Sequence, residues 1–127
     1  MSDTSKPNTF KSRHKFKERQ EESERIRDKY PDRIPLIVER ARDNKSLPLI
    51  DKSKFLVPSP IMVSNLLYIV RKRLKLDEKQ AIYLFSNNRL LNGQSLINEL
   101  YNSSKDEDGF LYLEYSSENT FGLLREA

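Results

Sequence analysis

The chain has 127 residues, a net charge of +4 and no cysteine. Its length fits one domain, and the missing cysteine excludes disulfides, thiolate metal sites and a cysteine nucleophile. No apolar run approaches the roughly 20 residues that span a bilayer, and no apolar signal segment opens the chain, so we expect a cytoplasmic protein with one small core.

The front of the chain is predicted to be a short extension followed by two helices. Residues 1–9 are polar without periodicity, which indicates a flexible extension, and residues 10–31 are expected to hold the helical pair. The longer helix is predicted over Arg19–Tyr30, which is rich in Glu, Arg and Lys and ends before Pro31. Because so few of its residues are apolar, Ile26 among them, this helix must lie on another element.

A strand is predicted over Arg33–Glu39, with apolar residues on both faces. Period-two alternation separates two sets, Ile34, Leu36 and Val38 against Pro35 and Ile37. A strand that is apolar on both faces indicates that the N-terminal helices cover the second side of the sheet. Pro35 has no N–H group, so we expect either an edge position for this strand or a local break in its pairing.

The remaining elements complete a mixed α+β fold. After a loop over 43–51 we predict a strand over Lys54–Pro58 and an amphipathic helix over Val63–Leu74, for which Ser59 and Pro60 could supply an N-cap and a first helical position. A strand over Ala81–Phe85, a turn at 86–89 and a very short strand at Leu90–Leu91 follow. The last elements are a helix over Ser95–Tyr101 and a strand over Phe110–Tyr115. This order predicts an α+β, ubiquitin-like β-grasp domain over residues 32–116, a mixed sheet crossed by a helix, with two additional N-terminal helices. Residues 117–127 are expected to form a flexible tail.

Catalytic residue patterns are not evident. The single histidine, His14, falls in the basic front and is expected to face solvent. The acidic run Asp106–Asp108 lacks the spacing of a calcium-binding loop and is expected to be solvated. With no glycine-rich phosphate loop either, we do not expect an enzyme, a cofactor or a metal.

Two kinds of binding fit the charge and strand patterns. A basic cluster suits nucleic acid, namely Arg71, Lys72, Arg73, Lys75 and Lys79, but no run interleaves aromatic and basic residues as a stacking platform would. An edge strand, either Arg33–Arg40 or Lys54–Val57, could instead pair with an extended peptide. The apolar residues that would line the peptide's pockets are equally consistent with packing of the helices on the sheet.

The C-terminal tail contains a glycine where no turn is needed. Gly122 follows Phe121 and precedes the remnant Leu123–Ala127. A residue without Cβ can enter a narrow protease channel, and its freed carboxylate is a sterically open acyl group. The alternative is a frayed terminus that happens to contain glycine.

Several motifs occur together in a recognisable order and spacing: Glu24-Arg25-Ile26, Arg33-Ile34-Pro35, Asp51–Pro58, Ile69–Leu74, Lys105–Tyr112 and Thr120-Phe121-Gly122. Over roughly Phe10–Gly122 they resemble the autophagy ubiquitin-like modifiers, the family of microtubule-associated protein light chain 3 and the GABA-receptor-associated protein. The resemblance implies that a cysteine protease cuts the Gly122–Leu123 bond. It further implies that ubiquitin-like activating and conjugating enzymes pass the Gly122 carboxylate to phosphatidylethanolamine of the autophagosome or of a vacuole or lysosome membrane. The chain would be a substrate and tag, without nucleic acid as a partner.

The same resemblance implies a docking site for aromatic-x-x-aliphatic motifs of cargo receptors. Matched motif by motif, the aromatic pocket falls on Glu22, Ile26, Pro35, Ile37, Lys54, Leu56 and Phe110, and the aliphatic pocket on Phe55, Val57, Pro58, Ile61, Leu66 and Ile69. Arg33, Lys52 and Arg73 would meet the acidic residues that flank such motifs. The alternative function is a basic β-grasp adaptor for peptide or nucleic acid that is not conjugated.

Overall fold

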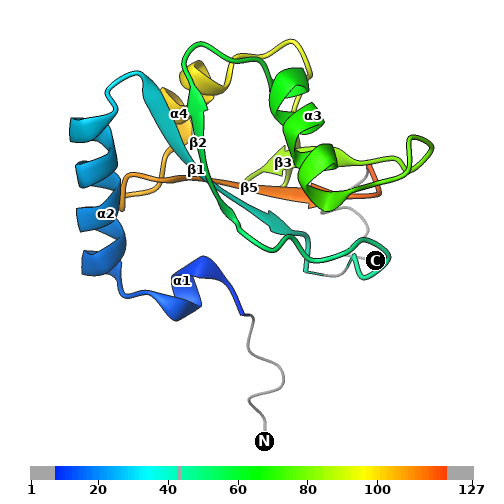
Figure 1. Cartoon of the computed structure of the whole chain (residues 1–127), viewed down its shortest axis with the longest axis horizontal. Helices are drawn as coiled ribbons and strands as arrows, with labels where there is room; N and C mark the ends of the chain where they lie inside the picture. Colours follow the sequence, from blue (N-terminus) through cyan, green and yellow to red (C-terminus); the bar gives the residue numbers. More distant parts are fainter. Residues whose placement is uncertain (1–7, 43, 120–127) are drawn as a thin grey trace, which may run out of the picture.

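The structure is a computed structural model that describes residues 8–42 and 44–119. Its elements are α1 (Phe10–Arg13), α2 (Phe16–Lys29), β1 (Arg33–Arg40), β2 (Lys54–Pro58), α3 (Val63–Leu74), β3 (Tyr83–Ser86), β4 (Arg89–Leu90), α4 (Ile97–Ser104) and β5 (Leu111–Ser116). The strands form one sheet in the order β2-β1-β5-β3-β4, in which β1 and β5 are parallel and the other pairs are antiparallel. The predicted mixed sheet with two leading helices is confirmed (Figure 1).

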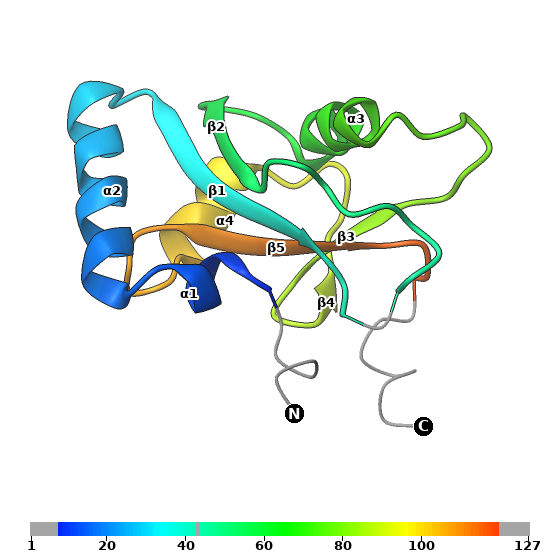
Figure 2. The same cartoon turned by 60° about the horizontal axis from the view of Figure 1, so that its bottom comes forward.

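Helices cover both faces of this sheet, as Figures 1 and 2 show from two directions. On one face, Leu36 of β1, Phe55 of β2 and Leu66 of α3 belong to the main hydrophobic cluster, which also includes residues of α4. On the other face, a second cluster joins Phe10 of α1 and Ile26 of α2 to Ile37 and Phe110. The prediction that the N-terminal helices cover the second side of β1 is therefore confirmed.

The predicted edge position of β1 is wrong. β1 lies between β2 and β5, where Pro35 pairs with Leu56 of β2. Val38 N donates to Ser53 O at 2.8 Å, and because hydrogen-bonded pairs alternate along an antiparallel ladder, the nitrogen of Pro35 faces away from β2. Pairing with β5 begins only at Leu36, so the missing N–H costs no ladder bond on either side. The pairing of β1 with β2 runs without a break through Pro35, so the orientation of its nitrogen accounts for this proline.

The predicted range of α3, Val63–Leu74, is confirmed, but the suggested roles of Ser59 as N-cap and Pro60 as first helical residue are wrong. Ser59 and Pro60 precede the helix, which begins at Val63 after Met62 as its N-cap residue. Ile61 is buried in the main cluster and Met62 forms a bridge with Leu96, so this segment runs extended beside the start of α4. Packing of the segment, and not the cap preference of Ser59, decides where the helix begins.

The turn between β3 and β4 follows the sequence prediction. Asn87 and Asn88 both have positive φ, at 51° and 66°, in the two-residue connection between the paired residues Ser86 and Arg89. Asparagine tolerates this conformation, which the twist of a tight hairpin favours. Within the described ranges, none of the helices has the length and apolar character that crossing a bilayer requires.

Candidate functional site

Strand β2 offers an open edge of the sheet. It pairs with β1 on one side and is the last strand in the sheet order on the other. Because Val38 N bonds to Ser53 O, the alternation of the ladder directs the backbone N–H and C=O groups of Lys54 and Leu56 away from β1. An extended chain can therefore add to the sheet here. Of the two strands that the sequence suggested for this role, only β2 is an edge.

Side chains of β2 alternate between the two faces of the sheet. Phe55 and Val57 are buried in the main cluster, whereas Lys54, Leu56 and Pro58 are exposed. The register with β1 places Leu56 opposite Pro35 and Lys54 opposite Ile37. The edge of β2 therefore separates a face that looks toward α2 from one that looks toward α3.

The seven residues predicted for an aromatic pocket come together on the face toward α2. Ile26, Ile37 and Phe110 belong to the second cluster, and Lys54 Nζ forms an ion pair with the carboxylate of Glu22 on α2. Ile37 and Phe110 are 0% exposed, whereas Leu56 is 36% exposed. The buried residues therefore form the floor of this face, and Leu56 lies at its surface.

The six residues predicted for an aliphatic pocket lie between β2 and α3. Four of them are buried in the main cluster, namely Phe55, Val57, Ile61 and Leu66. Pro58 is exposed, and Ile69 is half-buried against that cluster. Leu66 is 0% exposed, so it supports this face from beneath.

The three basic residues predicted to meet acidic flanks lie near the two ends of β2 and are exposed, namely Arg33, Lys52 and Arg73. Arg73 Nη1 donates to Lys52 O at 3.1 Å, and its guanidinium lies 4.2 Å from the ring centroid of Phe55. Arg33 Nη1 lies 3.4 Å from Leu56 O. These contacts hold positive charge at both ends of the open edge.

A buried carboxylate fastens the floor of the α2 face to the N-terminal helices. Asp108 is 0% exposed and accepts hydrogen bonds from Arg19 Nε at 2.8 Å, Tyr112 OH at 2.5 Å and Phe110 N at 2.8 Å. The expected solvated loop is therefore wrong at this residue, because the carboxylate neutralises the buried guanidinium of α2. Ser23 Oγ on the same helix donates to Asp108 O. We call Arg19, Ser23, Asp108 and Tyr112 the Asp108 cluster.

The phenol of Tyr112 is held in its neutral form by this cluster. Burial raises the pKa of Tyr112 far above its usual value, and the hydrogen bond to the Asp108 carboxylate raises it further. A phenolate beside a buried carboxylate would place two negative charges together. The hydroxyl group is therefore a permanent donor at neutral pH.

Phe10 is a site residue that the sequence analysis did not single out. It is 4% exposed, and its ring meets the ring of Phe110 edge-on at 5.3 Å between centroids. Its backbone N–H donates to Glu39 Oε2 at 2.7 Å. An aromatic residue in a basic segment, which also contains Phe16, was the only signal for this anchor. His14 lies beside it and is exposed, as expected.

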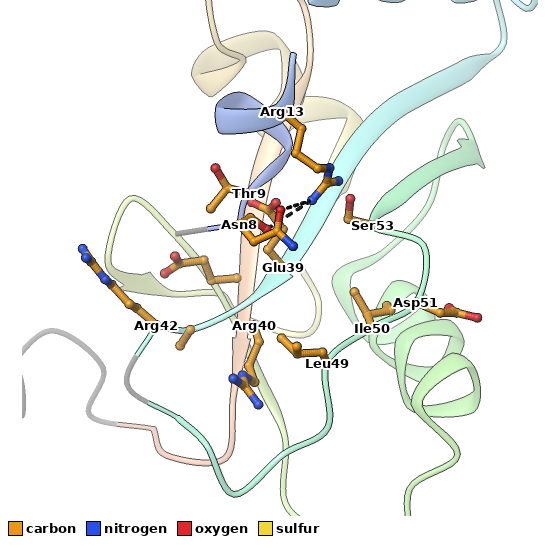
Figure 3. Close-up of a pocket in the computed structure, with 12 residues that line it drawn as sticks. Asn8, Thr9, Arg13, Glu39, Arg40, Arg42, Leu49, Ile50, Asp51 and Ser53 are labelled. Atoms are coloured by element: carbon orange, nitrogen blue, oxygen red, sulfur yellow. Dashed lines mark hydrogen bonds between the residues drawn. The ribbon is translucent and has the colours of Figure 1, made fainter. Parts of the chain in front are cut away.

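A separate cavity of about 640 Å³ lies at the end of β1, outside the predicted docking set (Figure 3). It is lined by Asn8, Thr9, Arg13, Glu39, Arg40, Ala41, Arg42, Leu49, Ile50, Asp51, Ser53 and Glu114. Three arginines and three carboxylates line it together, so its walls select neither sign of charge. In the described part of the chain, no group of three or more His, Asp or Glu side chains is arranged to hold a metal ion.

Comparison with known proteins gives the family. A family model described as "Autophagy protein Atg8 ubiquitin like" matches residues 18–122. The chain belongs to the Atg8 family. Autophagy-related protein 8c of Arabidopsis thaliana is 52% identical over 116 residues, covering 91% of this chain and 97% of that protein. Autophagy-related protein 8A of Oryza sativa subsp. indica is 53% identical over 114 residues, covering 90% and 95%.

A solved structure of the family has the same fold. The crystal structure of Trypanosoma brucei ATG8 superposes with a TM-score of 0.84 at 37% identity, covering 92% of this chain and all of that one. This Atg8-family chain is accordingly a ubiquitin-like modifier of autophagy and not an enzyme. Membership connects it in general with ubiquitin-like conjugation machinery and cargo receptors. The predicted processing residues Phe121 and Gly122 lie outside the described residues.

Proposed function

We propose that the Gly122 carboxyl group of this Atg8-family chain is the one joined to a membrane lipid. A cysteine protease hydrolyses the Gly122–Leu123 bond, one residue after Phe121, and water supplies the oxygen of the new carboxylate. An activating enzyme adenylates that carboxylate with ATP, releasing pyrophosphate, and an enzyme thiol then displaces AMP. The thioester passes to a conjugating enzyme, whose thiol leaves when the amine of phosphatidylethanolamine forms the amide.

The end of the family match is the observation that carries this proposal. The match stops at Gly122, so Leu123–Ala127 lie beyond the part shared with the family. β5 ends at Ser116, six residues earlier, and six extended residues span at most about 20 Å. Gly122 can therefore reach an enzyme channel while the sheet stays folded. The modified form would lie on autophagosome, vacuole or lysosome membranes, and the free form in the cytoplasm.

Intact-mass measurement of the chain from cells tests this assignment. The membrane-bound form should end at Gly122 and carry the mass of phosphatidylethanolamine. Gly122→Ala should block cleavage and lipid attachment, because a Cβ crowds the protease channel. Glu126→Gln, within the segment to be removed, is the control and should be processed normally. Lipid attachment to the Gly122→Ala chain would contradict the proposal.

We also propose that β2 docks aromatic-x-x-aliphatic segments of cargo receptors. In an extended segment, residues three apart project to opposite sides, because side chains alternate along the strand. The edge of β2 likewise has one candidate face toward α2 and another toward α3. A segment that pairs with the outward backbone groups of Lys54 and Leu56 would therefore place its aromatic and aliphatic side chains on the two faces.

Charge and exposure support a particular mode of entry. Lys54 and Leu56 lie opposite Ile37 and Pro35, above the buried floor that includes Phe110. The aromatic side chain would displace the exposed parts of Lys54 and Leu56 and contact that floor. Acidic residues of the segment would meet the exposed cations at the ends of β2.

Peptide binding measured by calorimetry tests the docking site. Leu56→Ala should weaken an aromatic-x-x-aliphatic peptide by about fivefold or more, since hot-spot residues near the centre of an interface contribute more than about 1 kcal/mol. Leu90→Ala is a matched control, because Leu90 is 50% exposed on β4, the opposite edge of the sheet. Equal losses in the two variants, or none at Leu56, would contradict docking at β2.

The acidic flank is tested separately by charge reversal. Lys52→Glu should weaken peptides that carry acidic flanking residues and leave neutral-flank peptides nearly unchanged. The difference should shrink as salt is added, because exposed charges are screened. A uniform loss for both kinds of peptide would contradict the assignment of Lys52 to the flank.

A further inference from the structure

The loop between β1 and β2 lies beside the end of β5. β1 and β5 are parallel, so both end at the same end of the sheet (Figures 1 and 2). Asn44 Nδ2 donates to Ser117 Oγ at 2.9 Å, and Ser117 N donates to Asn44 Oδ1 at 2.6 Å. The chain just after β5 is thereby fixed to this loop.

The same loop holds one leucine outward. Leu49 is 71% exposed, the highest value among the large hydrophobic side chains that the structure describes. Its backbone neighbours are fixed: Leu47 is 2% exposed with its carbonyl bonded by Arg40 Nη1, and Pro48 O accepts from Tyr115 OH at 2.7 Å. The fold anchors the loop immediately before this apolar side chain without burying it.

The covalent chain places this leucine near the proposed anchor. Ser117, which is bonded to Asn44 of this loop, precedes Gly122 by five positions, and five extended residues span at most about 18 Å. A lipid on Gly122 would therefore keep this end of the molecule close to the bilayer. Resting on the proposed conjugation of Gly122, we propose that Leu49, Arg42 and Lys45 form a membrane-contact surface that engages the bilayer once the chain is anchored.

The chemistry of these residues suits the interface between headgroups and acyl chains. A leucine gains from burial just below the headgroups, and long basic side chains keep their charges at headgroup level. Arg42 and Lys45 are exposed on the same loop, and Figure 3 places Arg40, Arg42 and Leu49 at one end of the cavity, opposite Arg13. The acidic residues Asp51 and Glu118 are exposed at this end too. Apolar contact by Leu49 therefore leads, and anionic lipid strengthens it.

This orientation leaves the docking edge accessible. β2 is antiparallel to β1, so it runs away from the loop, and Pro58 pairs with Arg33 at the opposite end of β1. A bilayer at the loop would approach the start of β2 and leave Leu56 and Pro58 free to meet a receptor. Membrane contact and peptide docking are compatible in one molecule.

A site-specific fluorescent probe tests the surface, since the chain has no cysteine of its own. Leu49→Cys is labelled with an environment-sensitive nitrobenzoxadiazole dye in residues 1–122 followed by a histidine tag. The tag anchors the protein to phosphatidylcholine vesicles that contain nickel-chelating lipid, with or without phosphatidylserine. Glu107→Cys, on the exposed loop that precedes β5, is the control.

Anchoring should blue-shift the probe at position 49 and slow its reduction by dithionite severalfold, with the larger effect in phosphatidylserine vesicles. The probe at position 107 should not change. Equal dithionite rates at position 49 for free and anchored protein would overturn the proposal, and equal effects in the two lipid mixtures would overturn the part assigned to Arg42 and Lys45. Because chelation replaces enzymatic attachment, failure of Gly122 conjugation is read separately, from the intact mass in cells.

Discussion

Replacing Asp108 by asparagine tests the attachment of the N-terminal helices to the sheet. The change keeps the size of the side chain and one acceptor oxygen for Phe110 N, but it removes the negative charge. Arg19, whose side chain is 10% exposed, would then be left as a nearly buried cation without its carboxylate. The neighbouring Glu107→Gln, on an exposed residue, is the matched control.

The expected loss follows from the contacts of the carboxylate. Hydrogen bonds to a charged group contribute about 1.5–3 kcal/mol each, and breaking a buried ion pair by removing one partner costs about 3–5 kcal/mol. Because the amide still accepts one or two bonds, we expect Asp108→Asn to lower the free energy of unfolding by about 3 kcal/mol. Glu107→Gln should change it by less than about 0.5 kcal/mol.

Urea unfolding followed by far-UV circular dichroism measures both values. The double variant Arg19→Met with Asp108→Asn supplies a sharper test, since removing both charges leaves no buried ion unpaired. Its loss of stability should be smaller than the two single losses added together. An Asp108→Asn chain as stable as the control, or strictly additive losses, would refute the role given to this ion pair.

Three further predictions concern the same region. Gly109 has φ of 93°, and a Cβ there would overlap the side-chain oxygen of Ser23 on α2, so Gly109→Ala should lower the free energy of unfolding in urea by more than about 1 kcal/mol. Gly93→Ala is the control and should lower it by less, because its Cβ would meet only Ser64 Cβ at 3.7 Å; similar losses in the two variants would contradict this. Because the pKa of Tyr112 is raised in the folded state, its neutral phenol contributes stability that is fully present below pH 10 and is lost as pH rises toward the pKa of the folded state. The urea midpoint of Tyr112→Phe should therefore fall less above about pH 10 than that of the parent chain. Burial raises the pKa of Asp106, but the hydrogen bond from Lys11 Nζ and a backbone hydrogen bond lower it by more, so the net pKa lies below its usual value. The stabilisation by the Asp106 carboxylate is therefore present above pH 3.8 and is lost as pH falls through the pKa of the folded state. Lys11→Met should make stability, followed by circular dichroism, fall less steeply in acid, and an unchanged acid profile would count against this role.

The sequence predicted which helices cover which face of the sheet better than it predicted the order of the strands. Apolar residues on both faces of β1 required cover on two sides, and the structure supplies α3 on one side and α2 on the other. Pro35 pointed to an edge strand because proline cannot donate, yet its nitrogen lies where neither neighbour requires a donor. Orientation within the ladder decides that point, and residue type alone does not encode it.

The candidate site shows the same division. The sequence predicted β2 as a short strand and a possible edge, but the grouping of Ile26 and Phe110 with Ile37 came from the resemblance to known modifiers. Asp108 was predicted to belong to a solvated acidic run, because the arginine that pairs with it lies 89 residues earlier. No local pattern predicts a partner at that separation.

The parallel pairing of β1 with β5 also has a consequence for protein synthesis. The centre of the sheet joins the first strand to the last, with Leu36 opposite Leu111. On the ribosome, α2 and β1 emerge before Asp108 and β5, which pack against them in the folded chain, have been made. Until β5 follows, β1 keeps a backbone edge and apolar side chains exposed, which is the condition that chaperones recognise in nascent chains. The proposed docking surface therefore cannot be completed until the last strand has been translated.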